Sequence, residues 1–220
     1  MTASTDPASA QRLGDFLEAL ASEKPVPGGG AAAAVSAALA ASLTAMVVRL
    51  SLDRPKYAEF ADLHATALVA SDAARVRFLE LAEEDATAYA AYRAARSLPH
   101  ETQAETDARE DATRDAARIA ASVPLEVVRA VHAQVELVDR VAGRSNLNVS
   151  SDLEVAALLL DSAARAAAAN IHANLPSVGD AGYASAVSAE LGQRLQQIQS
   201  TADRARERVA RGTLRRPEGE

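Results

Sequence analysis

The sequence contains no cysteine and no tryptophan, and aromatic residues make up only 3% of its 220 positions. The absence of cysteine excludes disulfide bonds, thiolate nucleophiles and cysteine zinc sites. Hydrophobic residues nevertheless account for 49% of the chain, which is enough for a continuous core. Because this share is mostly alanine with leucine and valine, the core has to be built from helices that approach each other closely.

An excess of positive charge is also missing. The formal charge of -7 argues against a general affinity for nucleic acid, since a basic face is needed to displace counterions. The N-terminus has neither the basic region nor the apolar core of a signal peptide. The most apolar stretch, residues 28–50, is dominated by alanine, and we interpret it as a buried helix rather than a membrane span. We expect a cytoplasmic protein that binds neither nucleic acid nor a membrane.

Proline and glycine clusters divide the sequence into segments of helical periodicity, and no segment alternates like a strand. Pro124 is expected to kink the fourth helix, and Ser151 with Glu154 has the spacing of a capping box at the start of the fifth. The pattern predicts an all-α fold, an antiparallel multi-helix bundle with long kinked helices. Helices are expected over residues 9–22, 30–52, 55–97, from the acidic stretch after residue 100 to the glycine at 143, 151–174 and 181–211.

These helices form a single predicted domain over residues 9–211. Disordered termini are expected over residues 1–8 and 212–220. Long alanine faces with few large residues bury little apolar surface within one chain, so we predict a homodimer.

One carboxylate interrupts the apolar stripe of the long third helix. Asp85 shares a helix face with Phe78, Leu81, Ala88 and Tyr89. A bare buried charge is too costly to keep, so Asp85 either pairs with a cation in the core or lines a polar cavity between helices. Periodicity alone leaves both interpretations open.

Residues 25–30, Pro-Val-Pro-Gly-Gly-Gly, lead directly into a helix. Unhindered backbone amides at the positive end of that helix suit a carboxylate or phosphate. The segment is not a phosphate-binding loop, because no Gly-Lys-Ser/Thr follows, and no strand precedes it as in a dinucleotide fingerprint. The alternative interpretation is a tight turn that allows close helix packing.

Two amide side chains share a face of the fifth helix. Asn170 and Asn174 lie four residues apart, beside Ala163 and Ala167. Such amides either recognise the edge of a heterocycle or cap a helix end. Asp152, in the first turn of the same helix, is explained by the helix dipole.

The familiar patterns of metal and covalent catalysis are missing. The four histidines show no ligand spacing, so no metal site is expected. Neither a Gly-x-Ser-x-Gly elbow nor a Ser-x-x-Lys pair occurs, which leaves covalent catalysis without a candidate.

Several short motifs follow one another in an order that carries more information than any one of them. They are Pro25-Val26-Pro27-Gly28-Gly29-Gly30, Lys56-Tyr57, Asp85-Ala86-Thr87-Ala88-Tyr89, Ser122-Val123-Pro124-Leu125, Asn146-Leu147, Ser151-Asp152-Leu153 with Ala156, and Asn170 with Asn174-Leu175. In this order the chain, from about Phe16 to the last helix, resembles the formiminotetrahydrofolate cyclodeaminase and methenyltetrahydrofolate cyclohydrolase family. Two positions depart from the family pattern: a serine is frequent where this chain has Ala31, and a phenylalanine where it has Tyr89.

The resemblance implies a dimeric helical bundle that acts on a tetrahydrofolate carrying a one-carbon unit, with no further cofactor. It implies that Asp85 handles the proton. Substrate-binding roles are implied for Lys24, Pro27, Gly28, Gly29, Gly30, Lys56, Tyr89, Asp152, Asn170 and Asn174.

Our hypothesis is hydrolysis of 5,10-methenyltetrahydrofolate to 10-formyltetrahydrofolate. The first alternative is cyclodeamination of formiminotetrahydrofolate, which releases ammonia and forms 5,10-methenyltetrahydrofolate. The second is a folate-binding or dimerisation module that has kept the scaffold without catalysis.

Overall fold

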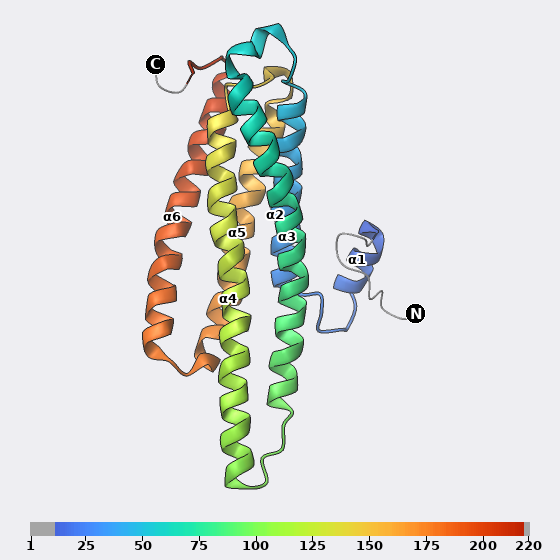
Figure 1. Cartoon of the computed structure of the whole chain (residues 1–220), viewed down its shortest axis with the longest axis vertical. Helices are drawn as coiled ribbons and strands as arrows, with labels where there is room; N and C mark the ends of the chain where they lie inside the picture. Colours follow the sequence, from blue (N-terminus) through green and yellow to red (C-terminus); the bar gives the residue numbers. More distant parts are fainter. Residues whose placement is uncertain (1–11, 218–220) are drawn as a thin grey trace.

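The structure is a computed structural model that describes residues 12–217. These residues form an elongated bundle in which successive long helices run antiparallel (Figure 1). They contain no strand, so the expected all-α bundle is confirmed. The elements are α1 (Leu13–Leu20), α2 (Gly29–Arg49), η1 (Pro55–Phe60, a 3-10 helix), α3 (Ala61–Arg96), α4 (Gln103–Val141), η2 (Leu147–Val149, a 3-10 helix), α5 (Ser151–Val178) and α6 (Ala181–Arg211).

The alanine-rich helix α2 lies in the core, packed against α3 and α5. Its small side chains let the neighbouring helices approach closely, as the scarcity of aromatic residues predicts. By length and composition alone α2 could cross a membrane, but 61% of its most apolar window is buried inside the bundle. Burial of this kind is what a core helix shows. The buried alanines of α2 are Ala31, Ala33, Ala34, Ala37, Ala38, Ala40, Ala41 and Ala45.

The hairpin of α3 and α4 projects beyond the N-terminal end of α2 and the C-terminal end of α5 (Figure 1). Helices α3 and α4 thus provide one wall for any site at those two helix ends. The short helix α1 stands beside the bundle, and its one buried residue, Phe16, belongs to the hydrophobic core.

The capping box lies at the start of α4 and not, as predicted, at the start of α5. The Thr102 hydroxyl accepts a hydrogen bond from the Glu105 amide (3.2 Å), and the Glu105 carboxylate accepts one from the Thr102 amide (2.9 Å). At α5 the N-cap is Ser150, whose side chain caps nothing, and Ser151 is already helical. The expected box of Ser151 and Glu154 is therefore wrong.

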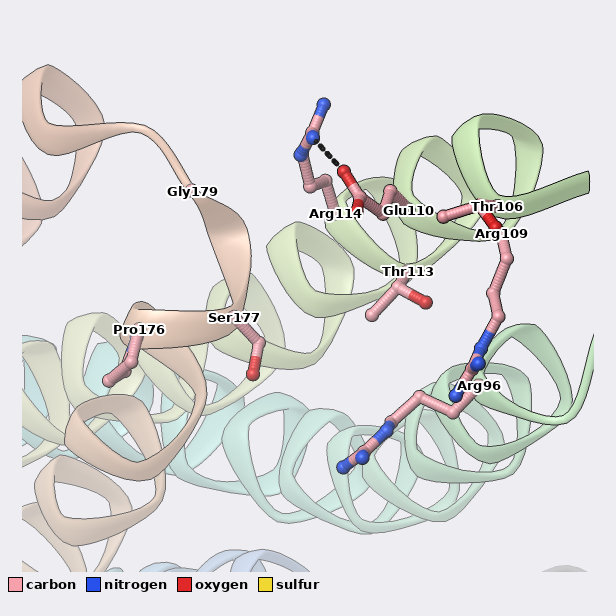
Figure 2. A pocket seen from close by; sticks show the side chains of 9 residues that line it. All are labelled: Arg96, Thr106, Arg109, Glu110, Thr113, Arg114, Pro176, Ser177 and Gly179. Atoms are coloured by element: carbon pink, nitrogen blue, oxygen red, sulfur yellow. Dashed lines mark hydrogen bonds and ion pairs between the residues drawn. The ribbon is translucent and has the colours of Figure 1, made fainter. Parts of the chain in front are cut away.

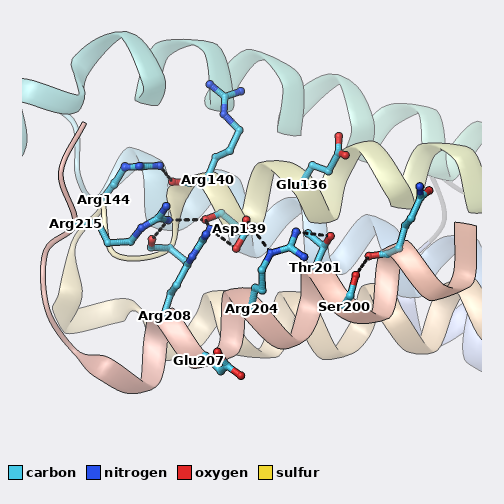
Figure 3. A network of polar contacts seen from close by, with 12 residues as sticks. Glu136, Asp139, Arg140, Arg144, Ser200, Thr201, Arg204, Glu207, Arg208 and Arg215 are labelled. Atoms are coloured by element: carbon cyan, nitrogen blue, oxygen red, sulfur yellow. Dashed lines mark hydrogen bonds and ion pairs between the residues drawn. The ribbon is translucent and has the colours of Figure 1, made fainter. Parts of the chain in front are cut away.

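At the opposite end of the bundle, a network of polar contacts holds α4, α6 and the residues after α6 together (Figure 3). Asp139 of α4 pairs with Arg208 of α6, and the Arg215 guanidinium donates to the carbonyl of Asp139 (3.0 Å). The Arg215 amide donates to the carbonyl of Gly143 (2.7 Å). Part of the tail that we expected to be disordered from residue 212 is thus anchored, whereas residues 1–8 and 218–220 lie outside the described residues.

Candidate active site

Asp85 lines a cavity of about 250 Å³ at the N-terminal end of α2. Its wall is formed by the turn before α2 with the first residues of that helix, the C-terminal third of α3, the middle of α4 and the last turns of α5. The other lining residues are Pro25, Val26, Gly28, Gly29, Gly30, Tyr89, Ala120, Asn170, Ala173 and Asn174.

The Asp85 carboxylate caps the start of α2 from the neighbouring helix. The N-cap residue of α2 is Gly28, which has no side chain to accept a hydrogen bond from the first amides. Asp85 accepts one from the backbone amide of Ala31 instead. A Cβ atom added at Gly30 would overlap the Asp85 carboxyl group, approaching Oδ2 to 2.6 Å. The glycine turn is therefore a close packing site built around this carboxylate, the second of the two interpretations above.

The charge on Asp85 has no nearby cation to balance it. Among residues 12–217 the structure contains no ion pair to Asp85, which removes the buried ion pair as an explanation for its position. Burial raises the pKa of Asp85 above its ordinary value, and the hydrogen bond from Ala31 opposes that rise. A half-buried carboxyl group that holds its proton to higher pH than an exposed aspartate is better suited to take up and return a proton.

Asn174 holds α5 against α4 at a proline. Pro124 has no N–H, so it cannot donate to the carbonyl of Ala120, four residues earlier. The side-chain amide of Asn174 donates to that carbonyl instead (2.8 Å). This contact leaves the side-chain oxygen of Asn174 as an acceptor in the cavity.

Asn170 makes a local hydrogen bond. Its side-chain amide donates to the carbonyl of Ala166 in its own helix (3.0 Å). A Cβ atom added at Gly29 would lie 3.5 Å from Nδ2 of Asn170, so the side chain covers the glycine turn. Both amides line the cavity, and the carbonyls that they bond lie inside helices and not at helix ends, so neither amide caps a helix end. Recognition of a heterocycle edge stays a prediction.

A sequence profile of the formiminotransferase-cyclodeaminase family matches residues 12–193. The chain belongs to this family. It is 35% identical over 170 residues to the methenyltetrahydrofolate cyclohydrolase of Methylorubrum extorquens, covering 77% of this chain and 81% of that protein. It is 29% identical over 190 residues to the formimidoyltransferase-cyclodeaminase of Sus scrofa, covering 86% of this chain but only 35% of that longer protein.

A crystal structure from the same family shares the fold. The formiminotetrahydrofolate cyclodeaminase of Thermotoga maritima superimposes with a TM-score of 0.83 at 25% sequence identity, covering 92% of this chain and 97% of that one. The resemblance inferred from the ordered motifs is confirmed.

Six of the binding residues implied by the family resemblance line the cavity together with Asp85: Gly28, Gly29, Gly30, Tyr89, Asn170 and Asn174. Pro27 belongs to the same turn but does not line the cavity, and Lys24 is exposed just before it. Lys56 lies in η1 and Asp152 in the first turn of α5, both at the other end of the bundle. Asp152 precedes the cavity residue Asn170 by 18 residues, which is a rise of about 27 Å along the helix. Within one chain, therefore, neither Lys56 nor Asp152 lies near Asp85.

Other family motifs connect helix ends far from the cavity. The side-chain amide of Asn146 donates to the carbonyl of Leu50 at the end of α2 (3.1 Å). The backbone amide of Leu147 donates to the hydroxyl of Tyr57 in η1 (3.2 Å). The structure accounts for Asn146-Leu147 and Tyr57 as parts of the scaffold.

The sequence analysis missed two lining residues, Ala120 and Ala173, and it included Pro25 and Val26 only as parts of the segment 25–30. Nothing in their side chains signals chemistry, and only the packing of α4 and α5 on the glycine turn places them at the cavity.

No group of three histidine, aspartate or glutamate side chains that could hold a metal ion occurs among residues 12–217. The expectation of a metal-free site stays a prediction.

Proposed function

We propose that this member of the formiminotransferase-cyclodeaminase family hydrolyses 5,10-methenyltetrahydrofolate to 10-formyltetrahydrofolate, with Asp85 as the acid and base. The observation that carries the proposal is the half-buried carboxylate without a cation partner among residues 12–217, set in a cavity between four helices. The one-carbon bridge of the substrate is an amidinium cation, which a carboxylate attracts. The 35% identity to a methenyltetrahydrofolate cyclohydrolase supports this substrate.

The reaction needs one group that first takes and then returns a proton. The oxygen of a water molecule bonds to the amidinium carbon while Asp85 takes one of its protons. The bond from this carbon to N5 then breaks, and N5 receives the proton from Asp85. The remaining hydroxyl becomes the formyl carbonyl and releases its proton to solvent. The cationic substrate and water thus give a neutral product and one proton, and no cofactor takes part.

The cavity walls supply orientation. Asn174 offers its side-chain oxygen to an N–H group of the pterin, and Asn170 and Tyr89 flank it. Val26 and Ala173 provide apolar surface for the ring. Holding water and substrate beside Asp85 lowers the entropic part of the barrier.

Cyclodeamination is the second candidate, and the structural similarity to the Thermotoga maritima cyclodeaminase favours it. In this reaction N10 bonds to the formimino carbon and the bond from that carbon to the terminal nitrogen breaks, so that ammonia leaves. Asp85 would take the proton that N10 releases on forming this bond and give it to the terminal nitrogen of the protonated formimino group, which then leaves as ammonia. A module that binds folate without turnover is the third alternative.

Assays of the purified chain with both substrates separate these functions. Hydrolase activity is read as loss of the methenyl absorbance, and deaminase activity as release of ammonia. We expect turnover of 5,10-methenyltetrahydrofolate, and ammonia release alone would favour the second candidate. The absence of both with folate binding intact would favour the non-catalytic module.

The role of Asp85 is tested by Asp85→Asn with Glu83→Gln as the matched control. Glu83 lies two residues away on α3 and does not line the cavity. We expect Asp85→Asn to lower turnover roughly a hundredfold to ten-thousandfold, and Glu83→Gln to leave it unchanged. A folded Asp85→Asn protein with wild-type turnover would rule out the proposed role.

The proposal includes a homodimer in the cytoplasm that binds neither nucleic acid nor a membrane. Helices α2 and α5 pack together and carry exposed apolar side chains. Among them are Leu39 and Met46 on α2, Leu50 directly after α2, and Val155 and Leu158 on α5. Covering these side chains with a second copy would remove apolar surface from water. Sedimentation at micromolar concentration checks the dimer, and a purely monomeric protein would contradict it.

A further inference from the structure

A second, larger pocket lies where the end of α5 meets the projecting hairpin of α3 and α4 (Figure 2). Its volume is about 400 Å³. Three arginines and one glutamate account for all its charged side chains. The lining residues are Arg96, Thr106, Arg109, Glu110, Thr113, Arg114, Pro176, Ser177 and Gly179.

Two of these arginines carry charge that no acidic side chain balances. Arg114 pairs with Glu110 (2.8 Å) and Asp111 (3.0 Å). Arg96 and Arg109, by contrast, have no ion pair among residues 12–217. Figure 2 shows Arg109 extending from α4 toward Arg96 on α3. Two guanidinium groups that face one pocket without a carboxylate between them favour an anionic ligand.

Hydroxyl groups contribute to the wall of the pocket, and an aromatic ring outside it contacts one of its arginines. Thr113 and Ser177 present their hydroxyl groups on its wall (Figure 2). The Arg96 guanidinium lies over the ring of Tyr92, 6.0 Å from its centroid, which limits the positions that this side chain takes. The site thus offers hydrogen-bond donors of the kinds that bind carboxylates.

The pocket that Arg96, Arg109 and Arg114 line, here called the arginine pocket, lies farther along the face of α3 that carries Asp85. On α3 the series Asp85, Tyr89, Tyr92 and Arg96 advances by four, three and four residues, so all four lie on one side. The 11 residues from Asp85 to Arg96 correspond to a rise of about 16 Å. Tyr92, which lies between Tyr89 and Arg96 in this series, is joined by a hydrogen bond (2.9 Å) to Ser177 of the larger pocket.

We propose that the arginine pocket binds the carboxylates of the glutamyl tail of the substrate whose one-carbon unit lies at Asp85. This inference rests on the proposed function. In a tetrahydrofolate an aminobenzoyl ring and an amide separate the reacting carbon from the first carboxylate. This part of the substrate and the length of an arginine side chain together span the rise from Asp85 to Arg96. Lys24, which the family resemblance implied as a binding residue, lines neither pocket.

The test compares substrates with and without a tail. The kinetics of the full chain are measured with monoglutamyl 5,10-methenyltetrahydrofolate and with an analogue truncated at the aminobenzoate. The variants are Arg96→Gln and Arg109→Gln. Arg93→Gln is the control, because Arg93 is exposed on the same helix and lies outside the pocket.

We expect the wild type and Arg93→Gln to show a KM for the monoglutamyl substrate about tenfold below that for the truncated analogue, with similar kcat. Arg96→Gln and Arg109→Gln should lose most of this preference by raising only the KM of the monoglutamyl substrate. A preference that is as large in these two variants as in Arg93→Gln would overturn the proposal.

Equilibrium binding separates this inference from the proposed reaction. The Asp85→Asn protein and the Asp85→Asn/Arg109→Gln protein are titrated with the same two ligands by calorimetry, which requires no turnover. A tail preference that depends on Arg109 supports the arginine site even if the wild type hydrolyses neither substrate. Equal affinity for the two ligands rejects the arginine site even if hydrolysis is observed.

Discussion

The carboxyl group of Asp85 occupies the space in which any residue larger than glycine at position 30 would place its Cβ atom. This relationship between α2 and α3 fixes where the carboxylate lies relative to the cavity. It also lets the first turn of α2 donate the Ala31 amide to that carboxylate. The same contact therefore serves the packing of two helices and the position of the proposed acid and base.

Gly30→Ala should displace Asp85 and reduce both turnover and stability. We expect turnover to fall about a hundredfold, because a small misplacement of a catalytic group has effects of this size. Overpacking should lower the free energy of unfolding by about 1–3 kcal/mol. Gly29→Ala is the control, since its Cβ would lie at an ordinary 3.5 Å from Asn170. Steady-state kinetics and urea unfolding of both variants check this, and equal effects would contradict it.

Asp85→Asn should inactivate the protein and yet stabilise it at neutral pH. The folded-state pKa of Asp85 is raised above its ordinary value of 3.8, so its contribution to stability is present below that value and is lost as the pH rises through the folded-state pKa. At pH 7 the buried charge opposes folding, and asparagine removes the charge while keeping an oxygen for the Ala31 amide.

We expect a higher Tm for Asp85→Asn than for the wild type at pH 7, by about 2–4 °C for each kcal/mol gained in the free energy of unfolding. The difference should vanish at about pH 4 and below. Thermal unfolding followed by circular dichroism at several pH values measures this. A lower Tm of Asp85→Asn at pH 7 would show that the charge is well accommodated.

Helical periodicity was sufficient to place Asp85 on the inner face of α3, because the buried residues Phe78, Leu81 and Ala88 lie at helical spacing on both sides of it in the sequence. Periodicity could not show that Gly30 of α2 lies against the Asp85 carboxyl group. That contact depends on the register between α2 and α3, which is set by many side chains distant in sequence. The same limit explains why Lys56 was grouped with Asp85: motif order does not tell which end of a bundle a residue occupies.

Helix boundaries depend on backbone conformation as well as on residue type. Thr102 and Ser151 are each followed three residues later by a glutamate, but only Thr102 forms a capping box. Thr102 has the extended conformation that an N-cap needs (φ -113°, ψ 161°). Ser150, the residue that precedes α5, is right-handed helical (φ -66°, ψ -25°), because η2 leads directly into the helix.

Glu190→Gln should weaken the contact between α4 and α6 in a pH-dependent way. Glu190 accepts hydrogen bonds from Arg129 (2.8 and 2.7 Å) and Arg194 (2.7 Å), which lower its pKa to about 2. Its contribution to stability is therefore present above its ordinary pKa of 4.5 and is lost as the pH falls toward about 2.

At pH 7 we expect Glu190→Gln to lower the free energy of unfolding by about 1 kcal/mol, since solvent screens these partly exposed side chains. The deficit should shrink between pH 4.5 and 2. Glu207→Gln serves as the control, because its contact with Arg211 is long (3.9 Å) and exposed. Urea unfolding across this pH range checks the prediction, and a deficit independent of pH would contradict it.

Asn174→Ala should destabilise the bundle, and Pro124→Ala should largely correct the defect. Asn174→Ala leaves the Ala120 carbonyl without the donor that Asn174 supplies, which should lower the free energy of unfolding by about 1–3 kcal/mol. Alanine at position 124 restores a backbone N–H four residues after Ala120, so the helix can bond this carbonyl itself.

A double-mutant cycle measures the coupling, which we expect to be about 1 kcal/mol or more. Asn170→Ala is the control, because its amide bonds the carbonyl of Ala166 and its cost should be the same with or without Pro124. An equal cost of Asn174→Ala in both backgrounds would reject the structural account. Turnover should stay low in Asn174→Ala/Pro124→Ala even where stability returns, because the acceptor oxygen that Asn174 contributes to the cavity is still missing.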